Sequence, residues 1–296
     1  MGISLQPLRL LLQARLAGVD FSTMATLGRH QLNLTTEQLA KTFTESGTSL
    51  EESVINSILA SSNGFSEPLF KQLGALEITS FDASPYEGAS VVHDFNKLLP
   101  AQYHNRYSLV IDSGSLEHVF DFPNAIGNLM QAVQVGGHLL ICTPANNYCG
   151  HGFYQFSPEL FYRILSEQSG FTVEGLYLTY GTRATWHQVA DPAVLGGRIF
   201  CNSRDATLMC ILARRTEAVD PFKIPPPQQS DYASTWSRGP APQDREIKPP
   251  GAVRRLVKLI IPHRLLALRR TLRKWLWRRA FKARALKSVP WTEAFS

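Results

Sequence analysis

The most informative stretch of this chain is YSLVIDSGSLEHVFDFPNAIGNLMQAVQVGGHLLICTPANNYCGHG, residues 107–152. Its pattern indicates a buried strand, a tight turn, an amphipathic helix, a Gly-Gly turn and a second buried strand. Asp112 ends the first strand and is followed by the small residues Ser113 and Gly114. Because open α/β sheets bind ligands beyond the carboxyl ends of their strands, we interpret this turn as part of a ligand-facing rim.

Three earlier apolar runs also end in small or acidic residues, and helical patterns separate several of them. These runs are residues 21–27, 76–81 and 90–93. Such alternation predicts an α/β fold with a doubly wound, mostly parallel sheet. Residues 171–179 and 206–213 are predicted to be later strands, and this last pair could be antiparallel.

Three of the strands end in a carboxylate, at Asp82, Asp94 and Asp112. A carboxylate after the second strand is well placed to accept hydrogen bonds from both ribose hydroxyls of a nucleoside. The first strand is followed by Gly28 but lacks the GxGxxG sequence that cradles a pyrophosphate. The pattern therefore favours a nucleoside ligand without phosphates. A structural alternative stays open for each Asp, because a strand-end Asp also caps the helix that follows.

With these residues in place, the chain resembles the class I S-adenosylmethionine-dependent methyltransferases over about residues 21–214. The likeness is carried, in order, by TLGRHQ, ITSFDASPYEG, VVHDFN, YSLVIDSGSLEHV, QVGGHLLICTPANN and GHGFYQFSPELF. The resemblance implies a seven-stranded sheet with an antiparallel last strand and S-adenosylmethionine as the cofactor. It also implies transfer of a methyl group by in-line displacement to an acceptor, which could be a small molecule, a glycan or a lipid precursor.

The family's cofactor contacts fall on four strand-end turns, which approach the methionine part, the ribose, the adenine, and the methionine again beside the acceptor. In that order the matching positions are Gly28; Asp82 and Ala83; Asp94 and Phe95; and Asp112, Ser113 and Gly114. About fifty residues separate Gly28 from Asp82, whereas a spacing nearer to roughly twenty is usual in nucleotide-binding units.

Methyl transfer needs a base only where the acceptor must lose a proton. His151, in the sequence GHG, and His118, after the Asp112 turn, are the candidate catalytic residues. Each could instead be a locally packed residue. The eight histidines have no spacing of the HExxH kind, so we expect no metal site.

Two other functions fit parts of the pattern. The single glycine after the first strand allows a non-catalytic binding module on a methyltransferase-like scaffold, because fold does not guarantee activity. A nicotinamide-dependent oxidoreductase is disfavoured by the missing phosphate cradle.

Composition divides the chain into four predicted segments. They are an N-terminal packing helix (1–20), a methyltransferase-like domain (21–216), a Pro-rich linker (217–250) and a basic amphipathic C-terminal tail (251–296). Residues 254–287 contain 13 Lys and Arg and no Asp or Glu, whereas the residues before them have 17 Lys and Arg against 23 Asp and Glu. This asymmetry predicts a separate role for the tail. An anionic membrane surface is the favoured partner, and nucleic acid is the competing one.

The four cysteines have neither CxxC nor zinc-finger spacing, which favours a reducing, cytoplasmic setting. No apolar run reaches the roughly 18 residues that a membrane-spanning helix needs, and the N-terminus does not resemble a signal peptide. We therefore predict a cytoplasmic protein that could dock peripherally at the inner membrane face.

Overall fold

The computed structural model describes residues 2–199, 201, 203–237, 239 and 285–295. The chain divides into two compact units. The first contains Met1–Val189, Ser203–Pro227 and Ser288–Ser296, and the second contains Ala190–Asn202 and Gln228–Lys287. All the predicted site residues belong to the first unit.

Among the described residues, the main sheet has nine strands in the order β11-β9-β8-β10-β7-β6-β2-β4-β5. Their bounds are β2 Thr23–Leu27, β4 Glu77–Asp82, β5 Val91–Val92, β6 Tyr107–Ser113, β7 Val133–Asn146, β8 Phe171–Tyr180, β9 Thr185–Val189, β10 Thr207–Arg215 and β11 Leu286–Pro290. The five strands from β5 to β7 are parallel, and β10 is antiparallel to both β7 and β8. The predicted α/β class and the antiparallel late strand are confirmed.

The predicted count of seven strands is too low, because β9 and β11 extend the sheet beyond β8. β9 pairs antiparallel with β8, and the backbone N–H of Trp291 donates to the carbonyl of Ala184 beside it. Each added strand has only five residues and no long apolar run, although single side chains such as Trp186 in β9 are buried. Short edge strands of this kind give a weak sequence signal.

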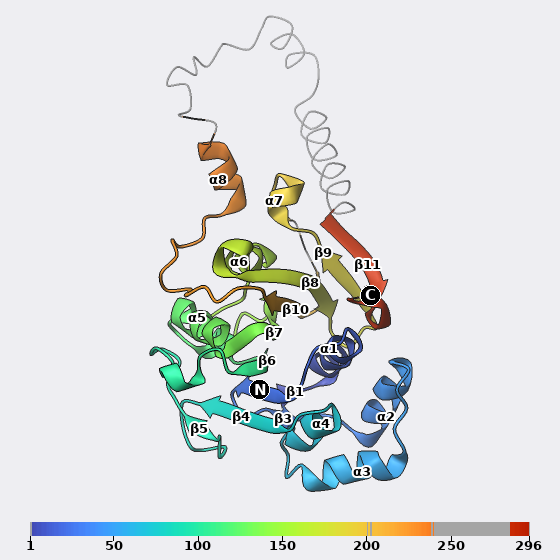
Figure 1. Ribbon diagram of the computed structural model, residues 1–296. Coiled ribbons are helices and arrows are strands. Elements are labelled where there is room, and N and C mark those ends of the chain that lie inside the picture. The colour runs from blue at the N-terminus through green and yellow to red at the C-terminus, as the bar shows by residue number, and fades with distance from the viewer. Residues whose placement is uncertain (1, 200, 202, 238, 240–284, 296) are drawn as a thin grey trace, which may run out of the picture. The chain divides into compact units, whose positions relative to one another are not determined.

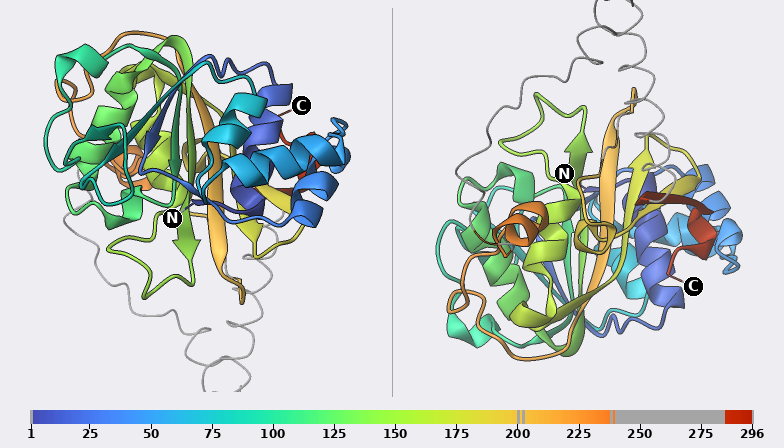
Figure 2. Two further views of the ribbon diagram at one scale, coloured as in Figure 1. Left: turned by 90° about the horizontal axis from the view of Figure 1, so that it is seen from below. Right: turned by 90° about the horizontal axis from the view of Figure 1, so that it is seen from above.

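Helices cover both faces of the sheet, so the first unit has three layers (Figures 1 and 2). Helices α1 to α4 lie on one face, and α5 and α6 lie on the other (Figure 2). The bounds are α1 Leu5–Leu16, α2 Thr36–Glu45, α3 Glu52–Ser61, α4 Glu67–Gln72, α5 Phe122–Ala132 and α6 Pro158–Ile164. Four short 3-10 helices join them: η1 Ala101–Tyr103, η2 Leu116–His118, η3 Glu167–Ser169 and η4 Trp291–Glu293. A small second sheet pairs β1 (Gly2–Ile3) in parallel with β3 (Gln31–Leu32).

Local sequence explains where several helices begin. Thr35 caps α2 in a reciprocal capping box with Gln38. Asp121 caps α5 by accepting the backbone N–H of Asn124, and Pro123 occupies the first turn of that helix. The elements β3 and α2 to α4 account for the long spacing between Gly28 and Asp82.

The last residues of the chain belong to the core of the first unit, which corrects the predicted tail of 251–296. Trp291 is 2% exposed. Its Nε1 donates to Oε2 of Glu45 at 3.2 Å, and the guanidinium of Arg9 lies 5.4 Å from its ring centroid. Residues 288–295 are therefore part of the first unit. Residues 251–284, on which the predicted basic helix and its membrane contact depend, lie outside the described residues.

The start of the Pro-rich segment also packs on the body, so the predicted linker of 217–250 begins too early. The ring of Phe222 lies on Gly127 of α5, where an added Cβ would come within 2.5 Å of it. Asp220 accepts a hydrogen bond from Nε2 of Gln131 at 3.1 Å. Residues 221–227, α5 and α6 together line a largely apolar groove of about 510 Å³. A separate connection can therefore begin only after Pro227.

In the second unit, α7 (Pro192–Leu195) and α8 (Ser230–Trp236) are in contact. Nε of Arg198 lies 2.7 Å from Oδ2 of Asp231, and the rings of Tyr232 and Trp236 stack with their centroids 5.6 Å apart. No helix within the described ranges is long and apolar enough to cross a membrane.

We predict that Trp291→Ala destabilises the first unit by about 3–5 kcal/mol, because it empties a large buried site. Trp236→Ala is the matched control, since that side chain is 60% exposed, and we expect it to change the free energy of unfolding by about 0.5 kcal/mol or less. Urea denaturation of both variants measures the difference. Equal effects would contradict the assignment of Trp291 to the core of the first unit.

Candidate functional site

The strand register brings the predicted turns to one edge of the sheet. Leu27, at the end of β2, pairs with Phe81 of β4 on one side and with Asp112 of β6 on the other. Asp112 in turn pairs with Ile141 of β7. The turns that follow these parallel strands therefore lie together, as predicted for a ligand-binding edge.

The turn after β6 is held by hydrogen bonds from its own backbone. Asp112 is fully buried, and its Oδ1 accepts the backbone N–H groups of Ser115 and Leu116 at 3.0 and 3.1 Å. Gly114 provides the positive φ of 82° that this turn requires. The hydroxyl of Ser115 donates to the carbonyl of Leu27 at 2.6 Å. The turns after β2 and β6 are thus joined directly.

Two buried carboxylates flank this turn. Burial, followed by the nearby charge of Glu117, raises the pKa of Asp112 well above its ordinary value. Burial likewise raises the pKa of Glu117. Within the described part of the chain, Oδ2 of Asp112 has no hydrogen-bond partner. Perturbed carboxyl groups of this kind cluster at functional sites.

The turn after β2 is tightly closed. Gly28 has a positive φ of 79°, and its N–H donates to the carbonyl of Phe81 at 2.7 Å. Burial lowers the pKa of His30 to about 4, and Nε2 of this ring lies 3.0 Å from the carbonyl of Leu27. Gly28 therefore takes the predicted position at the strand-end turn.

Asp82 and Asp94 stand at their predicted places, but their nearest partners are local. Oδ1 of Asp82 accepts the backbone N–H of Ser84 at 3.1 Å, and Ala83 beside it is exposed. Oδ1 of Asp94 accepts the backbone and side-chain N–H groups of Asn96, which lowers the pKa of Asp94. Each carboxylate caps a turn and keeps lone pairs for other donors.

Phe95 was predicted to lie beside the adenine, but its side chain turns into the core instead. It is 3% exposed and packs edge-on against Phe81, with the ring centroids 5.8 Å apart. The sequence after a strand cannot distinguish an aromatic ring that turns into the core from one that faces a ligand. Phe95 is a core residue.

The predicted catalytic histidines come together at the ends of β6 and β7. The ring centroids of His118 and His151 are 5.1 Å apart. Nε2 of His151 lies 3.5 Å from Oε1 of Glu117, whose side chain is fully buried. Thr143, near the end of β7, donates to Oε2 of the same carboxylate at 3.2 Å. Burial, followed by the proximity of His151, lowers the pKa of His118.

Glu117 and Thr143 were not among the predicted site residues. The only sequence signal for Glu117 was its place in LEH, directly before a candidate histidine. Ser113 was predicted to lie beside a ligand, and its hydroxyl donates to the carbonyl of Gly2 at 3.1 Å. The β1 segment therefore lies against this part of the rim.

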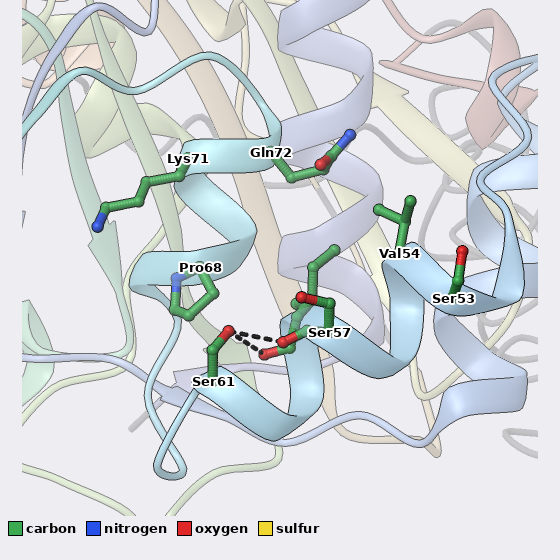
Figure 3. A pocket seen from close by; sticks show the side chains of 8 residues that line it. Ser53, Val54, Ser57, Ser61, Pro68, Lys71 and Gln72 are labelled. Carbon is green, nitrogen blue, oxygen red and sulfur yellow. Dashed lines mark hydrogen bonds between the residues drawn. The ribbon is translucent and has the colours of Figure 1, made fainter.

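A separate cavity of about 480 Å³ lies between α3 and α4 (Figure 3). It is lined by Ser53, Val54, Ser57, Ile58, Ser61, Pro68, Lys71 and Gln72. The hydroxyl of Ser61 donates to the carbonyl of Ser57 at 2.6 Å (Figure 3). This cavity shares no residue with the strand-end site.

Comparison with known proteins gives a distant structural likeness. No family model and no curated protein sequence matches the chain. A putative methyltransferase from Bacillus halodurans is 11% identical, with a TM-score of 0.39, over 70% of this chain and 99% of that one. The N-methyltransferase NodS from Bradyrhizobium japonicum, in complex with S-adenosylhomocysteine, is 16% identical with a TM-score of 0.38, over 70% of this chain and 84% of that one.

A third structure is the 1,6-didemethyltoxoflavin-N1-methyltransferase of Burkholderia thailandensis with bound 1,6-didemethyltoxoflavin and S-adenosylhomocysteine. It is 13% identical with a TM-score of 0.37, over 72% of this chain and 78% of that one. Because these scores are low, the assignment of the fold rests on the sheet itself. With β10 antiparallel between β7 and β8, and β6, β2, β4 and β5 in parallel order beyond β7, the chain has an open, mostly parallel α/β fold of the Rossmann-like type.

We predict that Asp112→Asn makes the free energy of unfolding less dependent on pH. The pKa of Asp112 is raised in the folded state, so its contribution is fully present below the unfolded pKa of about 3.9 and is lost as the pH rises through the folded pKa. Wild-type protein should therefore lose stability relative to the variant between pH 4 and pH 8.

Urea denaturation at several pH values measures this difference. Asp20→Asn, at an exposed position before β2, is the matched control for the loss of a carboxylate. If the difference in the free energy of unfolding between wild type and Asp112→Asn does not change with pH, the raised pKa of Asp112 is contradicted.

Proposed function

We propose that this protein is an S-adenosylmethionine-dependent methyltransferase that acts on a small-molecule acceptor. The observation that carries the proposal is the strand order, which places Gly28, Asp82, Asp94 and Asp112 on consecutive strand-end turns. This is the edge at which open α/β sheets bind their ligands. The complexes of the similar structures with S-adenosylhomocysteine agree with this choice of cofactor.

The residues of the cofactor half fit a nucleoside with a charged amino-acid arm. One oxygen of Asp82 is engaged by Ser84, and a carboxylate retains further lone pairs for a ribose diol. Because Gly28 has no Cβ, a ligand can approach the backbone of this turn closely. When bound, S-adenosylmethionine supplies an activated methyl group on a sulfonium.

The chain itself would orient the acceptor and take its proton. His118 lies in η2, which follows the turn of Ser113 and Gly114, and His151 lies in the loop after β7. Glu117 lies 3.5 Å from Nε2 of His151 and would stabilise the imidazolium that forms on proton uptake. Positioning supplies much of the rate in an in-line displacement, so the base is required only for an acceptor that ionises.

A non-catalytic binding module is the second candidate, and two contacts favour it. Nη1 of Arg29 donates to the carbonyl of Glu87 at 2.8 Å, which joins the turn after β2 to the loop after β4. Ser113 is engaged by the carbonyl of Gly2. A ribose bound between the two turns would have to displace the Arg29 contact. A protein that keeps the contact between Arg29 and Glu87 would bind no cofactor between these two turns.

Calorimetric titration with S-adenosylhomocysteine separates the two functions. We expect saturable binding to the full chain. Asp82→Ala should weaken this binding by about 1–3 kcal/mol, because a buried ribose hydroxyl would lose its acceptor. Asp20→Ala removes an exposed carboxylate at the opposite end of β2 and should leave the affinity unchanged.

The absence of saturable binding by folded protein would reject the methyltransferase proposal and support the binding module. Unchanged affinity of the Asp82→Ala variant would remove Asp82 from the site while leaving the proposal in place.

A further inference from the structure

Glu117, His118 and His151 lie together in one cluster. Glutamate and histidine are common metal ligands in proteins. Each of the three residues offers one ligand atom, and all three atoms lie within 4.8 Å of one another. Glu117 and His118 come from η2, after β6, and His151 comes from the loop after β7. His151 is 33 residues after His118 in the sequence, so the fold brings it to the other two.

Backbone hydrogen bonds fix the loop that carries His151. The carbonyl of Glu117 accepts the N–H groups of Phe153 and Tyr154 at 2.8 and 3.2 Å. Gly152 makes this approach possible, because an added Cβ would lie 2.8 Å from that carbonyl and 3.2 Å from Nδ1 of His118. A close approach of the two segments is therefore built into the structure.

A hydrogen bond to one oxygen orients the carboxylate of Glu117, and the other oxygen accepts no hydrogen bond from the described residues. Oε2 of Glu117 accepts the hydroxyl of Thr143 at 3.2 Å. Oε1 is buried, and no described residue donates a hydrogen bond to it. It points to the histidines, with Nε2 of His151 3.5 Å away. An outer residue that orients a ligating carboxylate is a regular feature of metal sites.

We propose that Glu117, His118 and His151 bind one divalent transition-metal ion, with Zn²⁺ as the best match. Two imidazoles and one carboxylate form a ligand set that catalytic zinc sites use, and they leave a coordination position open. Ca²⁺ and Mg²⁺ are disfavoured because they prefer ligand sets made of oxygen atoms. All three proposed ligands come from this chain. The metal-site proposal does not depend on whether the protein transfers a methyl group.

Metal binding requires only a small closure of the cluster. Neighbouring ligand atoms around tetrahedral Zn²⁺ are about 3.4 Å apart, given bonds of about 2.0–2.1 Å. No two of the ligand atoms here are more than 4.8 Å apart. His118 is exposed and the side chain of His151 is 45% exposed, so both rings can rotate toward the fixed carboxylate.

A simple histidine–carboxylate ion pair is the alternative, and the chain contains one for comparison. Nε2 of His138 lies 3.3 Å from Oε2 of Glu174. His138 is in the first half of β7, away from the end that leads to His151. Glu174 is 36% exposed, whereas Glu117 is fully buried and faces a second imidazole. The pair of His138 and Glu174 therefore provides matched control variants.

A bound metal would change how the acceptor is activated. The imidazole lone pairs would be held by the metal, so His151 would no longer serve as the base. A hydroxyl group in the open position would instead release its proton to solvent more easily, because a coordinated divalent cation lowers its pKa. If both proposals hold, the acceptor is an alcohol or a phenol that binds through oxygen.

Titration of the full, chelator-treated chain with Co²⁺, read by visible d–d absorption, and with Zn²⁺, read by calorimetry, tests the site without cofactor or substrate. We expect one equivalent to bind. Glu117→Gln, His118→Ala and His151→Ala should each weaken binding by roughly 10–100-fold or more, which is the loss seen even for outer residues. His138→Ala and Glu174→Gln should bind as wild type does.

Thermal melting checks that each variant is folded, and the two exposed histidine positions keep the test decisive even if Glu117→Gln does not fold. Cys149→Ser examines the exposed thiol in the same loop. The proposal is overturned if wild-type protein shows no stoichiometric binding, or if the His118→Ala and His151→Ala variants bind the metal as tightly as wild type does. Loss of binding in Cys149→Ser would also overturn it.

Discussion

The carbonyl oxygen of Leu27 accepts the hydroxyl of Ser115 at 2.6 Å, and this buried hydrogen bond joins the two strand-end turns on which the site is built. The same carbonyl lies 3.0 Å from Nε2 of His30. A buried carbonyl that loses its donor costs about 1–3 kcal/mol. The turns after β2 and β6 are therefore not independent loops. They form one rigid support, and a ligand at this edge would meet both together.

The same support determines the electrostatics of the site. Ser115 and Leu116 donate their backbone N–H groups to Asp112, and the next residue is Glu117. Two carboxyl groups are thereby buried close to one another, and burial raises the pKa of both. Fully buried carboxylates are rare unless they are paired. Their position at the carboxyl ends of parallel strands is consistent with a functional role, and Glu117 extends that role to the two histidines.

The sequence was sufficient for the strands whose apolar runs are long and for the edge on which their turns lie. It placed Gly28, Asp82 and Asp112 correctly at strand ends, because each follows an uninterrupted buried run. It did not reveal β9 and β11, because each has only five residues and no long apolar run. The expectation of no metal site came from local spacing, and local spacing cannot find Glu117 and His151, which meet only through the pairing of β6 with β7.

A crystal structure of the full chain with S-adenosylhomocysteine tests the central claim, that the strand-end rim is a cofactor site facing a reactive cluster. The account predicts the ribose hydroxyls at Asp82 and the sulfur beside the turn of Ser113 and Gly114, directed toward His151. A ligand bound elsewhere on the chain would contradict it. So would an empty rim, at saturating ligand, in which Arg29 still contacts Glu87.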